Sequence, residues 1–168
     1  MTSVDDAPSW RWCAFDELNL LELHDILRAR QQVFALEQNC VYLDIDGVDE
    51  RCFHLAAWRA GVREPLAYAR VVPPGLKYAE ASIGRVITTL PGRGLGLGRE
   101  LLRRAIVHAG AVFPGQGIRI SAQSYLEPFY GSFGFAIVGA RYLEDGIPHT
   151  EMLLPPDAVT GAPPAGSA

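Results

Sequence analysis

The sequence predicts an α/β (α+β) protein in which a mixed central β-sheet is flanked by helices. Short apolar runs typical of strands recur along the chain, and two long segments carry apolar residues at helical spacing. The composition fits a globular domain, with 49% hydrophobic and 20% charged residues. The 168 residues are expected to form one domain over 1–154, followed by a disordered Pro/Ala/Gly-rich tail over 155–168.

The expected elements follow the order β-α-β-β-β-α-β-α-β-β. Strands are expected over 10–15, 53–60, 65–72, 81–90, 117–123, 135–143 and 149–154. Helices are expected over 19–38, 97–113 and 125–133.

The first helix has a clear start and one apolar face. Asn19 is expected to cap it, with Glu22 as the capping-box partner. At about 100° per residue, the apolar face carries Leu23, Ile26, Leu27, Val33 and Phe34. Arg30 and Glu37 fall inside this apolar arc, where an unpaired charge would be costly. A structural ion pair is favoured for Arg30; for Glu37, binding or deprotonating an acceptor amine is an equal alternative.

The second long helix has a supporting charge pair and a stop signal. Glu100 and Arg104 can pair one turn apart, and Pro114 with Gly115 ends the segment. Its expected core face carries Leu97, Leu101, Leu102, Ala105 and Ala109.

Charge and cysteine content narrow the class of protein. A net charge of −4 argues against a duplex nucleic-acid binder. The three cysteines fit no CxxC metal or redox pattern, so free thiols in a reducing compartment and no metal are expected. The acidic N-terminus does not resemble a signal peptide, and no apolar run reaches the roughly 18 residues of a membrane span. A cytoplasmic protein without membrane partners is therefore expected.

A glycine-rich loop precedes the second long helix: the segment Leu90–Leu102 reads LPGRGLGLGRELL. A P-loop is excluded because Arg99 and Glu100 stand where Lys and Ser or Thr are required. A dinucleotide site is disfavoured because the spacing is GxGxG and the next strand ends without a carboxylate for a ribose. The third interpretation is an anion site at a helix N-terminus, to which Arg93 adds a positive charge.

This loop resembles the coenzyme A loop of the GNAT N-acetyltransferase superfamily, whose pattern is Gln/Arg-x-x-Gly-x-Gly/Ala. The residues that match are Arg93, Gly96 and Gly98, with Gly94 also usual. A second block about 30 residues further on resembles the superfamily pattern Asn-x-x-Ala-x-x-x-Tyr-x-x-x-Gly-Phe. The matching residues there are Tyr130, Gly134 and Phe135, whereas Gln123 replaces Asn and Leu126 replaces Ala.

The resemblance covers nearly the whole chain and is closest to the ElaA-like branch. The first helix carries Arg-x-x-Val-Phe-x-x-Glu-Gln over 30–38, and the ending Tyr-Leu-Glu-Asp-Gly-Ile-Pro-His covers 142–149. The branch supplies a class of chemistry and no particular substrate. The implied fold is the GNAT acyl-CoA N-acyltransferase fold.

The resemblance implies acetyl transfer from acetyl-CoA, as co-substrate, to a primary amine by direct attack. The pantetheine arm would run along strand 85–89, and a backbone N–H near Ile87 would polarise the thioester carbonyl. Tyr130 would be the general acid for the thiolate; packing in the core is its alternative role, and its register favours the catalytic one. The implied coenzyme-binding residues are Val86, Ile87, Thr88, Arg93, Gly94, Leu95, Gly96, Leu97, Gly98 and Tyr130.

Several further polar residues have a candidate functional role and a structural alternative. The acidic segment 40–50 lacks the glycine and ligand spacing of a calcium loop and is expected to be solvated. His54 is expected to be structural. Asp145 and His149 lie in the segment that often borders the acceptor pocket in this superfamily, so they join Glu37 as expected acceptor-binding residues.

The sequence thus predicts a GNAT N-acetyltransferase for a small-molecule or peptide amine, with a homodimer among the expected states because dimers are common in the superfamily. The first alternative is a non-catalytic acyl-CoA-binding or sensor domain on the same fold. The second alternative is a dinucleotide-dependent oxidoreductase, which the missing ribose carboxylate disfavours.

Overall fold

The computed structural model describes residues 7–161. In it the chain divides into two compact units. The first comprises Met1–Arg70 with Arg85–Leu102, and the second comprises Val71–Gly84 with Arg103–Ala168. A single domain over 1–154 remains a prediction.

One sheet has the strand order β1-β2-β3-β4. Its strands are β1 (Ser9–Ala14), β2 (Phe53–Trp58), β3 (Ala67–Val72) and β4 (Ser82–Thr88). β1 and β2 pair antiparallel, from Ser9 opposite Trp58 to Ala14 opposite Phe53. All six residues of β3 are buried, as its nearly continuous apolar run predicts.

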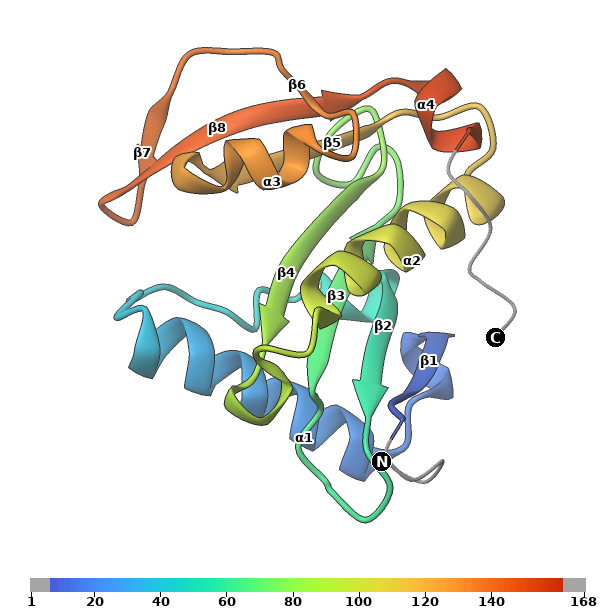
Figure 1. The fold of residues 1–168 in the computed structure, drawn as a ribbon, viewed down its shortest axis with the longest axis vertical. Helices are drawn as coiled ribbons and strands as arrows, with labels where there is room; N and C mark the ends of the chain where they lie inside the picture. Colours follow the sequence, from blue (N-terminus) through green and yellow to red (C-terminus); the bar gives the residue numbers. More distant parts are fainter. Residues whose placement is uncertain (1–6, 162–168) are drawn as a thin grey trace. The chain divides into compact units, whose positions relative to one another are not determined.

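The first helix, α1 (Leu20–Gln31), begins as predicted: the Asn19 side chain accepts from the Glu22 amide, and the Glu22 carboxylate accepts from the Asn19 amide. The chain continues into a π-helical segment, η3 (Gln32–Glu37). Figure 1 shows α1 lying against the sheet. The contact is a buried apolar cluster formed by Ile26, Ala29, Val33, Ala56, Tyr68 and Ile87.

One short 3-10 turn and a second long helix flank the glycine loop in sequence. β4 leads into η5 (Leu90–Gly92), and α2 (Leu97–Val112) follows the loop. The predicted core face of α2 is confirmed, because Leu97, Leu101, Leu102, Ala105 and Ala109 are all buried. The other 3-10 turns are η2 (Phe15–Glu17), η4 (Asp49–Arg51) and η6 (Ser124–Leu126).

The second unit contains an antiparallel sheet centred on its longest strand. β8 (Ile147–Leu154) pairs with β5 (Ile118–Gln123), β6 (Ala136–Ile137) and β7 (Tyr142–Glu144). Helix α3 (Glu127–Gly131) follows β5 through η6.

The predicted strand over 135–143 is only partly correct. It is divided into β6 and β7, and residues 138–141 lie outside both strands. The amide of Val138 still donates to the Glu151 carbonyl, but Arg141 turns to Glu127, with an Nε–Oε1 distance of 3.0 Å. This side-chain ion pair accompanies the departure of the backbone from the ladder.

The predicted disordered tail is wrong at its start. Residues Pro156–Thr160 form a short helix, α4, in which Val159 is buried. A Cβ on Gly110 would lie 2.8 Å from Cγ1 of Val159, so the glycine allows α4 to approach α2 closely. The predicted tail over 162–168 lies outside the described residues.

Candidate active site

The glycine loop of the first unit has two residues in the left-handed region. Gly94 has φ +77° and Gly96 has φ +71°, and a Cβ on either would meet nothing within 4 Å. Backbone conformation therefore requires glycine there, and the space above both residues is open. Gly92 is different, because its Cβ would lie 2.1 Å from the Leu66 carbonyl oxygen.

Helix α2 begins directly after this loop. The first amides of a helix have no partner within it, and the helix dipole adds partial positive charge there. α2 has 16 residues, and the loop residues 93–96 before it are exposed. Loops with left-handed residues can form concave arrays of N–H groups that suit anions. The loop thus combines open space, directed donors and the charge of Arg93.

The adjoining strand β4 ends its sheet. In the described part of the chain, β3 is its one neighbour in that sheet, so β4 presents an edge to an extended ligand. Ile87 points into the core at 3% exposure, whereas Val86 and Thr88 are partly exposed. The side chains of 86–88 therefore alternate between the buried and the more exposed face of the sheet.

Arg85 on β4 has φ +51°, a strained backbone conformation for any residue other than glycine. Its side chain is held on three sides. Nε lies 2.7 Å from Oδ1 of Asp44, Nη2 lies 3.3 Å from Oδ2 of Asp46, and the guanidinium lies over the Tyr42 ring at 5.2 Å. These contacts fix the β4 backbone two residues before Ile87.

Glu37 does not lie inside the apolar arc, which corrects the helical projection. From Gln32 the chain is π-helical, so the rotation about the helix axis from one residue to the next is smaller than in an α-helix. In keeping with this, the amide of Gln38 donates to the carbonyl of Val33, five residues earlier. Glu37 is exposed and forms an ion pair with Arg93. The structure therefore joins a predicted acceptor residue to a predicted coenzyme residue.

The acidic segment 40–50 is exposed at six of its eleven positions, which fits the expected solvated loop in part, but its aspartates are paired. Its three aspartates and three arginines from the helix and strands form a closed ring of alternating charges, here called the charge ring. Around the ring the order is Asp44, Arg30, Asp49, Arg70, Asp46 and Arg85. Each carboxylate thus bridges two guanidinium groups.

The charge ring is most deeply buried at Arg30. The Arg30 side chain is 0% exposed and reaches Asp44 at 2.9 Å and Asp49 at 2.8 Å. Burial alone would raise the pKa of Asp49, but hydrogen bonds from Arg30 and Arg70 lower it below its ordinary value. The structural role favoured for Arg30 is consistent with these contacts.

His54 is structural, as expected. Its Nδ1 lies 2.8 Å from the Tyr68 hydroxyl and its Nε2 lies 2.9 Å from the Asp49 carbonyl oxygen. Burial lowers the pKa of His54, which keeps the ring neutral.

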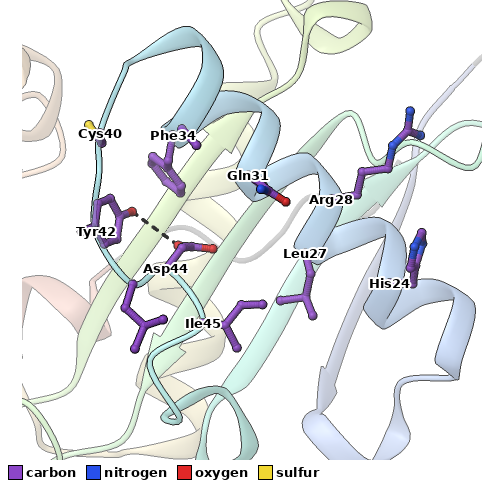
Figure 2. Close-up of a pocket in the computed structure, with 11 residues that line it drawn as sticks. His24, Leu27, Arg28, Gln31, Phe34, Cys40, Tyr42, Asp44 and Ile45 are labelled. Atoms are coloured by element: carbon purple, nitrogen blue, oxygen red, sulfur yellow. Dashed lines mark hydrogen bonds between the residues drawn. The ribbon is translucent and has the colours of Figure 1, made fainter.

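A pocket of about 440 Å³ lies between α1 with η3 and the segment 40–45 (Figure 2). Leu27, Phe34 and Ile45 give it apolar walls. Asp44 is its one carboxylate among the lining residues, and it already accepts from Arg30 and from the Tyr42 hydroxyl at 3.4 Å. The pocket therefore offers apolar surface but no unengaged negative charge.

In the second unit, Tyr130 is buried at 7% exposure on α3. Its ring makes edge contacts with Phe129 at 5.2 Å and with Phe135 at 5.9 Å between centroids. Burial raises the pKa of Tyr130 to about 12, so the hydroxyl carries its proton at neutral pH.

Asp145 and His149 occupy different places in the β7–β8 hairpin. Asp145 is exposed in the turn with φ +49°, followed by Gly146 with φ +74°. His149 stacks on Tyr142, and its Nε2 lies 3.5 Å from a carboxylate oxygen of Glu144. The Tyr142 hydroxyl is hydrogen-bonded to Ser121, whose hydroxyl also donates to Glu144. Ser121 was not among the predicted site residues, because the cluster joins side chains from three strands, β5, β7 and β8, that are distant or reversed in sequence.

Two further findings concern metals and membranes. Within residues 7–161, no group of three His, Cys, Asp or Glu side chains is arranged to hold a metal ion. The helices found in the same range are too short or too polar to cross a bilayer. Among the described residues, Cys13, Cys40 and Cys52 are buried and form no disulfide.

Several known proteins are similar to this chain in sequence and in architecture. A family model described as an acetyltransferase (GNAT) domain matches residues 67–155. UPF0039 protein sll0451 from Synechocystis sp. is 39% identical, over 89% of this chain and 97% of that protein. Protein ElaA from Escherichia coli is 37% identical over 85% of this chain and 94% of its own length, and its crystal structure superposes with a TM-score of 0.82. An acyl-CoA N-acyltransferase from Pseudomonas aeruginosa, 37% identical over 88% of this chain and 99% of that chain, gives a TM-score of 0.83.

The chain belongs to the GNAT acetyltransferase family, in its ElaA-like branch. Its fold is the acyl-CoA N-acyltransferase fold, and the class of reaction is acyl transfer. The family assignment from the glycine loop and the Tyr130 block is confirmed.

Proposed function

We propose that this protein is an N-acetyltransferase that moves an acetyl group from acetyl-CoA to a primary amine by direct attack. The observation that carries the proposal is the loop 93–98, where Gly94 and Gly96 adopt positive φ between an edge strand and the start of α2. Its open space and donors fit a pyrophosphate. Neither the acetyl group nor the acceptor follows from the family alone.

Backbone N–H groups and one positively charged side chain would bind the coenzyme. Amides of the segment 94–98 and the guanidinium of Arg93 would bind the pyrophosphate. Backbone groups of Val86 and Thr88 would pair with the pantetheine arm along the edge of β4. Acetyl-CoA would supply an activated thioester carbonyl and a thiolate leaving group.

The chain's own groups would assist at two points. A backbone N–H at or near Ile87 would donate to the carbonyl oxygen as negative charge develops there, which contributes roughly 3 kcal/mol in sites of this kind. As the amine nitrogen bonds to the carbonyl carbon and the carbon–sulfur bond breaks, the Tyr130 hydroxyl would give its proton to the sulfur. The proton that the nitrogen then loses would return through water to the Tyr130 oxygen, which balances the step. A phenol whose pKa is raised to about 12 carries its proton before the carbon–sulfur bond breaks, as a general acid must.

Asp145 and His149 stay predicted acceptor residues. His149 is the better placed of the two, because its ring is oriented by Tyr142 and by a 2.8 Å contact of Nδ1 with the Ile147 carbonyl oxygen. Asp145 has a conformational role in the turn that is independent of any substrate.

A thermal-shift titration with acetyl-CoA, coenzyme A and NADH tests the proposal first. Ligand at about 100 times its Kd stabilises by about 2.7 kcal/mol, a rise in Tm of roughly 5–10 °C for this chain length. Stabilisation by acetyl-CoA and coenzyme A, followed by thiol release with an amine panel, would support the transferase. Binding without thiol release for any amine would favour the acyl-CoA sensor, and stabilisation by NADH alone would overturn both.

A further inference from the structure

Glu37 and Arg93 form an ion pair between the end of η3 and the beginning of the glycine loop. Nη2 of Arg93 donates to Oε2 of Glu37, and Nε of Arg93 donates to the Thr88 carbonyl oxygen at 3.2 Å. The guanidinium is therefore held beside the end of β4 by a carboxylate on one side and a carbonyl on the other.

The Glu37–Arg93 pair is open to exchange because both side chains are solvated. Arg93 is 41% exposed and Glu37 is 30% exposed. Ion pairs with this exposure are weak, since water competes for both charges. A pyrophosphate offers more negative charge and more acceptor oxygens to a guanidinium than one carboxylate does.

If a pyrophosphate draws the Arg93 guanidinium away, the Glu37 carboxylate is left without a positively charged partner. Among the described residues, Arg93 is its one ion-pair partner. The neighbouring carboxylates cannot take this role, because Asp44, Asp46 and Asp49 each bridge two arginines in the charge ring. Glu37 is thus a carboxylate that contacts the loop through a partner that can be withdrawn.

We propose that Glu37 changes partner during binding: it holds Arg93 in the absence of coenzyme and binds a cationic nitrogen of the acceptor once the pyrophosphate has taken Arg93. This rests on the proposed function, since it requires pyrophosphate at the loop. A protonated nitrogen has no lone pair for attack, so the nitrogen held by Glu37 is not the one that is acylated. The acceptor class is therefore an amine with a second, cationic nitrogen, such as a diamine.

The first experiment measures coenzyme affinity of Glu37→Gln by calorimetry. Removing the competing carboxylate is expected to tighten coenzyme A binding about two- to fivefold, the strength of an exposed ion pair. Acetyl-pantetheine, which lacks the pyrophosphate, should bind equally well to both proteins. Glu50→Gln is the matched control, because Glu50 is exposed, lies outside the proposed site and carries the same charge. Unchanged or weaker coenzyme A binding to Glu37→Gln would overturn the exchange.

The second experiment measures coupling between the two ligands. Saturating coenzyme A should strengthen binding of 1,4-diaminobutane to the wild type, and reciprocity requires the same factor in the other direction. 1,4-Butanediol, which has the same chain length but no cationic nitrogen, should show no coupling, and Glu37→Gln should abolish the coupling for the diamine. Butylamine is a cation at neutral pH and can pair with Glu37, but it then has no second nitrogen for attack, so its thiol release should be lower than that of the diamine. Equal coupling for the diamine and the diol, or coupling that survives in Glu37→Gln, would overturn the acceptor role.

The same data separate this inference from the proposed function. If the wild type binds no coenzyme A, the loop assignment fails and the exchange fails with it. If the wild type binds coenzyme A and Glu37→Gln behaves as Glu50→Gln does, the exchange alone is wrong. Melting curves of both variants in the absence of ligand show whether each is folded.

Discussion

Arg30 and Asp49 are joined by a hydrogen bond of 2.8 Å, with the Arg30 side chain 0% exposed and that of Asp49 7% exposed. The pair connects the last turn of α1 to the turn that precedes β2. Because Asp49 also accepts from Arg70 at 3.0 Å, one buried carboxylate ties the helix to strand β3. The pair therefore fixes the segment 40–49, which contributes to the pocket and holds Arg85.

Replacing Arg30 with Met should destabilise the protein strongly. Breaking a buried ion pair leaves an uncompensated charge, which typically costs about 3–5 kcal/mol. Urea unfolding of Arg30→Met against wild type measures the loss. Arg28→Met is the control, since Arg28 is exposed on the same helix. Equal stability of the two variants would show that the charge ring does not hold α1 to the loop.

Acid should weaken the charge ring through Asp46. Burial alone would raise the pKa of Asp46, but hydrogen bonds from Arg70 outweigh it and lower the pKa to about 2. A carboxyl whose folded pKa is depressed stabilises the protein above its unfolded pKa of about 4 and loses that contribution as the pH falls toward 2. Asp46→Asn should be less stable at pH 7 and should show a shallower fall of unfolding free energy between pH 4 and 2. A parallel pH profile would exclude Asp46 as a source of acid sensitivity.

Local signals in the sequence were sufficient for much of the fold. The Asn19–Glu22 capping box, the apolar face of α2 and the glycine loop depend on residues within a few positions of one another. Such features follow from backbone geometry, which is the same in every protein.

Non-local arrangements could not be predicted in the same way. The Arg85–Asp44 pair joins residues that are far apart in sequence, and its geometry depends on the register of two strands and a loop. The position of Glu37 depends on a π-helical segment for which no sequence signal was identified. One clue was available: Arg70 interrupts an otherwise apolar strand, which indicates a buried charged partner.

Tyr130→Phe should lower turnover and leave coenzyme affinity almost unchanged. The phenyl ring preserves contacts with Phe129 and Phe135 but cannot protonate the leaving sulfur. General acids typically contribute about 10²–10⁴-fold to rate. Thiol release measures turnover, and calorimetry with acetyl-CoA measures affinity. Full turnover in this variant would assign Tyr130 a packing role.

Val159→Ala tests the short helix α4. Val159 is 4% exposed and packs at Gly110, so its two methyl groups are buried. Their loss should reduce stability by about 1.5 kcal/mol. Ala158→Gly is a neighbouring control that removes one methyl group at a partly exposed position. If Val159→Ala is no less stable than the control, α4 does not contribute to the core.

Gly96→Glu should abolish binding of coenzyme A, because it places bulk and negative charge where the pyrophosphate is proposed to lie. Two effects have to be separated, since any side chain at φ +71° costs about 1–2 kcal/mol in addition to its charge. Gly96→Ala introduces the strain without the charge and should retain measurable affinity. Gly61→Glu introduces both at a second site, because Gly61 has φ +74°, has equally open surroundings and lies in the turn between β2 and β3. The expected order of coenzyme A affinity is therefore wild type and Gly61→Glu together, then Gly96→Ala, with Gly96→Glu showing no binding by calorimetry. Because strain is common to all three variants, retained binding in Gly96→Glu would mean that no anion occupies the loop, and the phosphate site would have to be sought elsewhere on the chain.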